Sequence, residues 1–479
     1  MASSVIGRFF QKRAVAGIFI SPTFCRFCGR RSTSYARFSN SRCGDYRMIS
    51  TISSRKVPSL ILPPPFEGDD MVYKFYGLAE NKVWSSSKSS RGEESESPDN
   101  DAEMVGSSHG WIVLFNRRNN DLFLSNPLSR RHIKLPPIDI LPDPEINLRN
   151  GHGSVSKVIL SASPDDERCR AVMTFGPGNR LAFCLPGRSW RWTPIGDLFL
   201  LRGTFISQRY SPHHKSVGKF ARVYEDMVYC RGRKVLTCMT ACEINLVSFS
   251  NHHPDSEMEN WDIESPLMED WNMGKLDLEE DWEIGYPSME LWNIRERVCN
   301  DDTFRPSKKE REGGDKTRAW VAENIALLQQ QCVQIPHLVF AEQSDQLFLV
   351  MRFVVLMGAD GMPLDQVPHN QIMGLSGYYR CKTVGFIVLQ VDEDGACKVV
   401  DGLNGLAMFV GINHSFAISA SELGFIPNSI YFTDAKRITM MYGSRDTGVF
   451  DYENKIITNI VVPGDDPIVS SPMWFNPLC

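Results

Sequence analysis

The sequence predicts an all-β fold: a single β-propeller of roughly six to eight blades that follows a cleavable N-terminal presequence. Short apolar runs that pair around polar turns recur along about 400 residues, which is typical of a β-rich domain. That span is too long for one β-sandwich, and no linker divides the middle of the chain. The start of the chain is rich in arginine and poor in acids, which indicates a separate segment.

The clearest hairpin lies in the first third of the chain. The stretch Trp111 to Phe115 is apolar, an Asn-rich turn follows it, and Asp121 to Ser125 resumes the apolar pattern. Asn126-Pro127 ends the second run, because proline has no N–H to donate to a ladder. The segment is typical of an antiparallel pair. Taken alone, it fits a propeller blade and any other β-meander equally well.

The same pattern recurs from residue 158 to residue 450. Two apolar runs flank a short polar turn in each case, as expected for consecutive antiparallel strands. The pairs are 158–162 with 171–175, 220–224 with 227–230, 338–341 with 347–355, 384–391 with 397–400, and 438–442 with 448–450. A further run at 181–185 follows the first of these pairs. One of the expected turns lies at Glu225-Asp226.

Residues 1–57 are predicted to be an organellar transit peptide. The first 56 residues hold eleven Lys or Arg residues and one acid, Asp45, for a net charge of +10. The apolar run from Ala14 to Ile20 is too short to span a bilayer. A basic, Ser-rich and acid-poor start is typical of import into an organelle. We expect the mitochondrion, with the plastid as the alternative and a disordered basic arm as a third interpretation.

Two segments interrupt the hairpin pattern. Residues 85–103 combine a serine run with acids and lack the apolar side chains that would offset ordering entropy, so we predict a disordered loop. Residues 251–315 form an acidic insertion, in which residues 251–302 hold 16 acids and 3 bases for a net charge of −13. So acidic a surface repels a nucleic-acid backbone, and no nucleic-acid partner is expected.

The acidic insertion contains a short internal repeat. Each copy places a tryptophan beside acids and amides, and the four tryptophans are Trp261, Trp271, Trp282 and Trp292. Tryptophan buries a large area at low entropic cost, so these four side chains are the candidate partner-binding residues. In this interpretation they anchor an exposed acidic arm on a basic protein partner. The alternative is an expanded loop whose tryptophans lean on the propeller surface.

No catalytic constellation is recognisable in the sequence. Phosphate-loop, zinc-protease and nucleophile-elbow motifs are absent, so we predict no catalytic residue, no cofactor and no metal site, and expect the protein not to be an enzyme. His109 precedes a strand and is interpreted as bracing the Gly106–Gly110 turn. Asn413-His-Ser415 resembles a glycosylation site in form only. The scattered cysteines show no disulfide pattern, and no segment approaches a membrane span.

Two motifs in the right order connect the chain to a known family. The first is G-S-S-H-G-W at 106–111, followed by L-F-L-S-N-P-L at 122–128 and L-P-P at 135–137. The second runs from D-G-L-N-G-L at 401–406 through P-N-S-I-Y-F-T-D at 427–434 to Trp474-Phe475. Together they resemble the plant KIB-type β-propeller proteins, a kelch-like, F-box-associated domain of unknown function. The resemblance implies one propeller over residues 58–479.

The resemblance also implies two functional hypotheses. In that family an F-box binds a Skp-type adaptor, and the propeller recruits a client for ubiquitination or inhibition. Here the basic residues 1–57 stand where a Leu-rich F-box is expected, so we expect an organellar branch without the F-box and no contact with a ubiquitin-ligase adaptor. The first hypothesis is a non-catalytic organellar module that binds unidentified protein partners. The alternative is a ubiquitin-ligase substrate adaptor or kinase inhibitor in the cytosol or nucleus.

Overall fold

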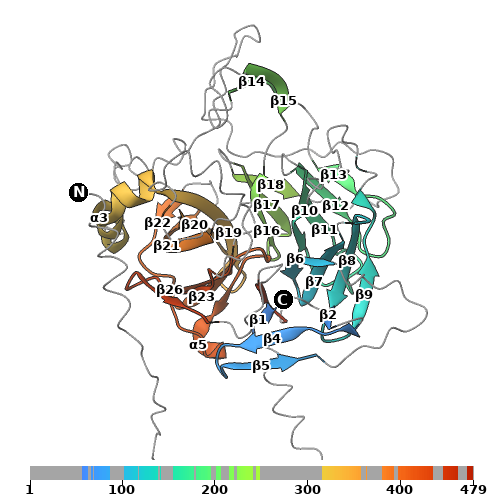
Figure 1. The fold of residues 1–479 in the computed structure, drawn as a ribbon, viewed down its shortest axis with the longest axis horizontal. Coiled ribbons are helices and arrows are strands. Elements are labelled where there is room, and N and C mark those ends of the chain that lie inside the picture. Colours follow the sequence, from blue (N-terminus) through green and yellow to red (C-terminus); the bar gives the residue numbers. More distant parts are fainter. Residues whose placement is uncertain are drawn as a thin grey trace, which may run out of the picture. The chain divides into compact units, whose positions relative to one another are not determined.

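The computed structural model describes residues 57–62, 66–67, 70–86, 102–116, 118–138, 141, 155–176, 180–195, 201–206, 215–220, 224–240, 244–248, 315–357, 363, 380–392, 397–434, 446–461 and 472–477. All of them belong to one compact unit, Thr51–Cys479. They form mostly antiparallel strands (Figure 1). The predicted all-β class is therefore confirmed. No helix in these ranges is long and apolar enough to cross a membrane.

The first and last strands of this unit share one sheet. β28 (Met473–Phe475) pairs antiparallel with β1 (Ser59–Leu62), and β1 pairs with β4 (Lys74–Gly77). β5 (Lys82–Ser85) completes the sheet at its far edge. Because the strand nearest the C-terminus pairs with the first one, this sheet joins distant parts of the sequence without a covalent link.

Two regular four-stranded sheets follow along the chain. The first contains β6 (Glu103–Ser108), β7 (Trp111–Asn116), β8 (Asp121–Asn126) and β9 (Arg131–Lys134), each paired with the next. The second contains β10 (Val155–Leu160), β11 (Ala171–Phe175), β12 (Arg180–Cys184) and β13 (Thr193–Ile195) in the same order. The predicted hairpin at 111–125 is confirmed as β7–β8, with Phe115 opposite Leu122.

The next sheet corrects one prediction. It contains β16 (Tyr224–Cys230), β17 (Val235–Thr240) and β18 (Ile244–Ser248). The predicted turn at Glu225-Asp226 is wrong, because both residues lie inside β16 at a bulge and the chain turns at 231–234 instead. Asp226 is buried in an ion pair, so an acid that resembled a turn signal is part of the core. Two short pairs lie outside the larger sheets: β14 (Leu201–Ile206) with β15 (Lys215–Phe220), and β2 (Phe66–Glu67) with β3 (Asp70–Met71).

A nine-stranded sheet contains the last third of the chain. Its strands are β19 (Cys332–Ala341), β20 (Gln346–Met357), β21 (Arg380–Val391), β22 (Cys397–Val399), β23 (Leu406–Val410), β24 (Phe416–Ser419), β25 (Ser429–Phe432), β26 (Gly448–Asp451) and β27 (Ile456–Asn459). The pair Phe340–Phe416 joins β19–β22 to β23–β27, so the sheet consists of two blades. Helix α3 (Asp315–Gln330) precedes β19, and the short α5 (Ala420–Leu423) follows β24. The predicted strand at 438–442 lies outside the described residues.

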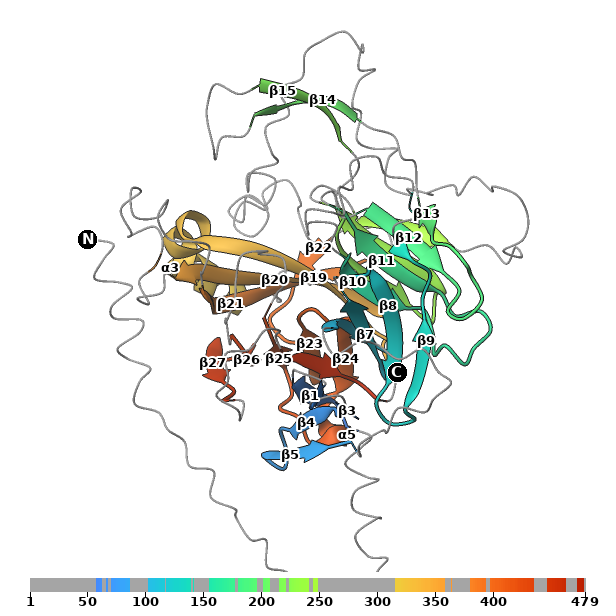
Figure 2. The same cartoon turned by 45° about the vertical axis from the view of Figure 1, so that its right-hand side comes forward.

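The apolar core lies between the sheets. Consecutive clusters pack β6–β8 against β10–β12, then β10–β12 against β16–β17, and β16–β17 with α3 against β19–β22. Further clusters join β19–β21 to β23–β26, β23–β25 to β1 and β28, and finally β1 and β4 to β6–β8. The series closes on itself within the described residues, and the sheets that it joins are the six blades of a propeller. Figures 1 and 2 show the ring of sheets. The predicted propeller is confirmed at the lower end of the expected blade number.

Tight turns between the strands explain why the hairpins could be predicted from the sequence. In the β6–β7 turn, His109 has a φ of 50° and Gly110 a φ of 73°, as a type I′ turn requires. Asn120 and Asp345 adopt similarly positive φ values in the β7–β8 and β19–β20 turns. Asn and Asp tolerate this region better than other side chains, so the polar turn signal reflects real backbone geometry.

Candidate functional site

Polar side chains gather where the first strands of neighbouring sheets meet. β6, β10, β16 and β19 are neighbours in that order. We call Ser108, Lys157, Asp226 and His414 the inner polar cluster. The first three lie on β6, β10 and β16, and His414 lies in the loop between β23 and β24. Ser108, Lys157 and Asp226 are buried, and His414 is partly buried. Polar groups that converge from several strands are candidates for a functional site, so their geometry matters.

The hydrogen bonds of His414 determine where its ring proton lies. The backbone N–H of Tyr229 donates to His414 Nε2 at 3.4 Å, so the proton of a neutral ring lies on Nδ1. Nδ1 then donates to Ser108 Oγ at 3.0 Å, and the same Oγ accepts the N–H of Leu160 at 3.0 Å. Burial, followed by the neighbouring charges of His109 and Lys157, holds the pKa of His414 well below its ordinary value. The ring is therefore neutral near pH 7.

This geometry does not activate Ser108. A nucleophilic serine passes its proton to an imidazole nitrogen that carries none. Here the facing nitrogen carries the proton, and Ser108 Oγ already accepts two hydrogen bonds. The pair instead ties the β23–β24 loop to β6 and β10. The backbone N–H of His414 also donates to the carbonyl of Ser107 at 2.9 Å, which strengthens that connection.

The second half of the inner polar cluster is an ion pair. Lys157 Nζ lies 2.6 Å from Asp226 Oδ1, with side chains 11% and 4% exposed. Asp226 Oδ2 accepts the backbone N–H of Leu338 at 2.8 Å. One carboxylate thus connects β10, β16 and β19, which belong to three successive blades.

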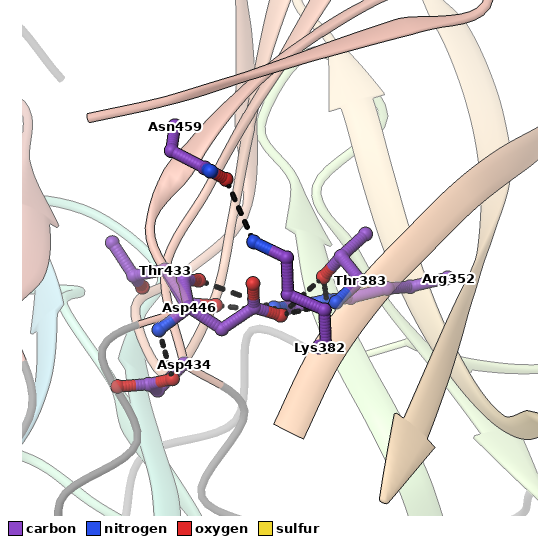
Figure 3. Close-up of polar contacts among 7 residues, drawn as sticks. All are labelled: Arg352, Lys382, Thr383, Thr433, Asp434, Asp446 and Asn459. Atoms are coloured by element: carbon purple, nitrogen blue, oxygen red, sulfur yellow. Dashed lines mark hydrogen bonds and ion pairs between the residues drawn. The ribbon is translucent and has the colours of Figure 1, made fainter. Parts of the chain in front are cut away.

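A second buried network joins the two halves of the nine-stranded sheet (Figure 3). Arg352 on β20 pairs with Asp446, which precedes β26, at 3.0 Å between Nη2 and Oδ2. Arg352 Nε donates to Thr383 Oγ1 at 2.9 Å, and Nη1 donates to the carbonyl of Thr433. The Thr383 N–H donates to Asp446 Oδ2 at 2.7 Å, and the Asp446 N–H donates to Asp434 Oδ1 at 2.9 Å. The guanidinium also lies over the Phe432 ring. The guanidinium and one carboxylate oxygen of Asp446 bond to groups from β20, β21 and the β25–β26 connection, so the network is a structural connection between blades.

A different set of charges lies on exposed turns. We define the turn face as five turns that connect strands within successive blades: 127–131 (with Arg131, the first residue of β9), 161–170, 185–191, 231–234 and 342–345. These turns are far apart in the sequence. Contacts join the turns 127–131 and 185–191 to the turn 161–170, and the turn 231–234 to the turn 342–345. The charge of Arg231 also acts on Asp166 and so connects the two sets. Arg131 pairs with Asp165, and Arg188 donates to the carbonyl of Glu167. Glu342 accepts the backbone N–H groups of residues 231 and 232 at 3.0 and 3.2 Å.

The turn face continues through one more pair and one exposed ring. Arg233 Nε donates to Asp345 Oδ1 at 3.1 Å, and both residues are exposed. Trp190 is 70% exposed, and the guanidinium of Arg191 lies 5.0 Å from the centre of its ring. Leu128, on a neighbouring turn, is 39% exposed. The turn face therefore combines charges of both signs with apolar side chains in contact with solvent.

The residues that the sequence singled out have different outcomes. The candidate partner-binding tryptophans Trp261, Trp271, Trp282 and Trp292 lie outside the described residues. His109 lies in the β6–β7 turn, with its ring 5.7 Å from that of His414. This turn is shorter than the expected Gly106–Gly110 turn, because residues 106–108 belong to β6. The Asn413 and Ser415 of the glycosylation-like sequence are 0% and 1% exposed, which leaves no room for a glycan.

The described cysteines are free thiols, as the lack of a disulfide pattern predicted. Burial raises the pKa of Cys169 and of Cys381 to about 12 and that of Cys230 to about 11, so these thiols stay protonated at neutral pH. Within the described ranges, no three His, Cys, Asp or Glu side chains are placed to hold a metal ion together.

Several of the residues described above were missed by sequence reasoning. A charge inside an apolar strand was the available signal for Arg352, which stands between Met351 and Phe353. The same signal marks Lys157 within β10. The exposure of Trp190 had no sequence signal, because an indole beside arginines is equally consistent with a buried ring.

Comparison with known proteins identifies the fold family. The family model of the KIB1-4 β-propeller matches residues 75–451. This chain belongs to that family. No curated protein matches the chain. Among solved structures, the chain is similar to "Dihydro-heme d1 dehydrogenase NirN in complex with DHE" at 10% identity and a TM-score of 0.21, over 93% of this chain and 78% of that one. A likeness this distant carries no argument about function.

Proposed function

We propose that this member of the KIB1-4 β-propeller family is a non-catalytic protein-interaction module that works inside an organelle, the mitochondrion before the plastid. The family assignment supports the coarser part, because a propeller offers a rigid scaffold whose exposed turns are free to bind other proteins. Non-catalytic action and the organellar address are the finer parts, and each has its own support.

The observation that carries the non-catalytic part is the protonation of the inner polar cluster. The one serine–histidine pair in that cluster has its ring proton on the side that faces the serine. The lysine and aspartate beside it bond to each other and to the backbone of Leu338. These groups hold blades together, and the chemistry they offer a substrate is correspondingly small.

The organellar part is supported by residues 1–57. Their net charge of +10 over the first 56 residues, set against −15 in the rest of the chain, is the composition that import machineries recognise. In this reading the basic segment is removed on arrival, and the propeller works without it.

Import into isolated organelles tests the address. The radiolabelled full chain should become shorter and resistant to external protease in energised mitochondria, and a chain that begins at residue 58 should stay outside. Uptake by chloroplasts alone would move the address to the plastid. Failure of both organelles to take up the full chain would refute the organellar part of the proposal.

Proximity labelling tests the interaction module. The full chain fused at its C-terminus to a labelling enzyme should mark a reproducible set of organellar proteins. Residues 1–57 fused directly to the same enzyme provide the background of the compartment. A set identical to that background would contradict the proposal, and recovery of cytosolic Skp and cullin proteins alone would favour the ubiquitin-ligase adaptor.

A further inference from the structure

The turn face has a composition that differs from the rest of the molecule. Its five turns hold nine Arg or Lys residues and five Asp or Glu residues, a net charge of +4 in a chain whose net charge is −5. The acids are already engaged: Asp165 with Arg131, Asp166 with Arg168, and Asp345 with Arg233. Of the nine basic residues, all except the partly buried Arg170 are exposed.

An apolar anchor stands within this basic surface. The Trp190 ring is 70% exposed and has Arg191 stacked against it, while Arg188 of the same turn reaches the neighbouring turn at Glu167. Tryptophan and arginine are the residues on which protein interfaces depend most, and an exposed tryptophan buries a large area when a partner covers it. Leu128 adds a second exposed apolar side chain on the adjacent turn.

We propose that the turn face binds an acidic polypeptide segment of a partner protein, with Trp190 and Arg191 as the anchor. The inference rests on the proposed function and specifies the chemistry of the partner. Carboxylates of the segment pair with the arginines that surround Trp190, and an apolar or aromatic side chain of the segment packs on the exposed indole face.

The charges on the turn face favour a polypeptide over a nucleic acid. Asp165, Asp166 and Glu167 form one turn in the middle of the basic surface, and Glu342 and Asp345 form another. A phosphate backbone carries its charges at fixed, short intervals and meets these acids unfavourably. A polypeptide can place a carboxylate opposite each arginine and a neutral residue opposite each acid, and interfaces gain specificity from such alternation.

Fluorescence anisotropy with the full-length protein tests the proposal. The probe is a labelled 16-residue peptide of Glu, Asp and Tyr at about 0.15 M salt, and the control probe has Gln and Asn in place of the acids. The acidic peptide should bind and the neutral one should not. Trp190→Ala and Arg191→Glu should each weaken binding by roughly tenfold or more, as truncated hot spots do.

Two matched variants lie away from the turn face. Ile426→Ala removes an apolar side chain that is 53% exposed, and Arg118→Glu reverses an exposed arginine on the β7–β8 turn. Both should change the affinity less than about twofold, within the range of rim substitutions. Equal losses in all four variants would show non-specific attraction and overturn the proposal.

Two further outcomes also decide the question. A single-stranded oligothymidylate of equal charge that binds more tightly than the peptide would assign the turn face to nucleic acid and overturn the proposal. Absence of peptide binding, in a protein that still labels propeller-dependent neighbours in the organelle, would reject the acidic partner while the proposed function stands. Loss of both results would reject the two together.

Discussion

The buried network around Arg352 and the exposed turn face both pair arginine with aspartate, yet they differ in what surrounds the pair. The side chains of Arg352 and Asp446 are 0% and 1% exposed, whereas those of Arg131 and Asp165 are 54% and 60% exposed. In the first pair, water is excluded, and Asp446 Oδ2 accepts from Arg352 and from the Thr383 N–H instead. In the second, water competes for both partners and screens them.

This difference assigns the two regions different roles. A buried ion pair costs much desolvation and persists only when further hydrogen bonds compensate it, as Thr383 and the carbonyl of Thr433 do for Arg352. An exposed pair contributes little stability and can exchange its partner for another carboxylate. The same two residue types therefore fasten blades together in one place and remain available for recognition in another.

The largest effect is expected when the buried pair is broken. Asp446→Ala leaves the Arg352 guanidinium buried without its carboxylate and removes the acceptor of the Thr383 N–H. We expect a loss of about 3–5 kcal/mol in the free energy of unfolding, measured by chemical denaturation.

The double variant Arg352→Met/Asp446→Leu provides the control. It removes both charges, so it should lose clearly less than Asp446→Ala, although the Thr383 N–H remains without its acceptor. If the single and double variants were equally unstable, the network would act through packing rather than through charge.

The inner polar cluster should rank second, because its lysine keeps some contact with water. Asp226→Ala removes the partner of Lys157 and the acceptor of the Leu338 N–H, and should cost about 2–4 kcal/mol. Asp226→Asn keeps one carbonyl oxygen and should lose roughly half as much. Denaturation of the two variants side by side measures the difference. An Asn variant as unstable as the Ala variant would mean that the charge itself is required.

The fold was predictable because hairpins are local. The apolar runs and polar turns around residues 111–125 and 338–355 specify strands and their partners within a few residues of sequence. The number of blades could not be predicted in the same way, because it depends on how separate hairpins pack. Asp226 shows the limit of local reasoning: its partner Lys157 is 69 residues away, so an acid next to Glu225 looked like a turn.

The candidate site was less predictable than the fold. Arg352 contacts residues 31, 81 and 94 positions further along the chain, and only the closed arrangement of blades brings them together. The turn face joins turns from separate blades, so its charge cannot be read from any one segment. The four tryptophans of the acidic insertion were recognisable as a repeat in the sequence, but their role in partner binding remains a prediction.

Lys455 is an intermediate case, a buried cation whose nearest partners are neutral. Its Nζ lies 3.4 Å from the centre of the Tyr452 ring and donates to Thr317 Oγ1 of α3 at 3.0 Å. Burial, opposed by the charges of Asp401 and Asp451, lowers the pKa of Lys455 to about 7 from 10.5. The folded state thus holds fewer protons than the unfolded state above pH 7, and stability rises with pH through that window.

Comparison with Lys455→Met isolates the contribution of the Lys455 amine to the pH dependence of stability. Between pH 7 and 8.5, where the buried thiols stay protonated, wild-type stability should rise relative to the variant by about 1–2 kcal/mol. Denaturation curves of both proteins at several pH values in that range measure the difference. Parallel pH profiles would show that the amine is no less protonated in the folded state, and Lys455 would then belong with the exposed charges.

The smallest effect is expected at the exposed pair. Asp165→Ala removes the carboxylate that Arg131 contacts, in a position where water replaces it at once. A hydrogen bond and the charge from Arg131 lower the pKa of Asp165, so whatever the pair contributes is lost as the pH falls through that lowered pKa. A double-mutant cycle with Arg131→Ala should give a coupling below about 1 kcal/mol.

The same two variants should alter binding of the acidic peptide, because removal of Asp165 increases the positive charge of the turn face and removal of Arg131 decreases it. A coupling as large as the loss expected for Asp446→Ala would mean that exposure does not separate the two regions. The turn face would then have to be regarded as part of the scaffold.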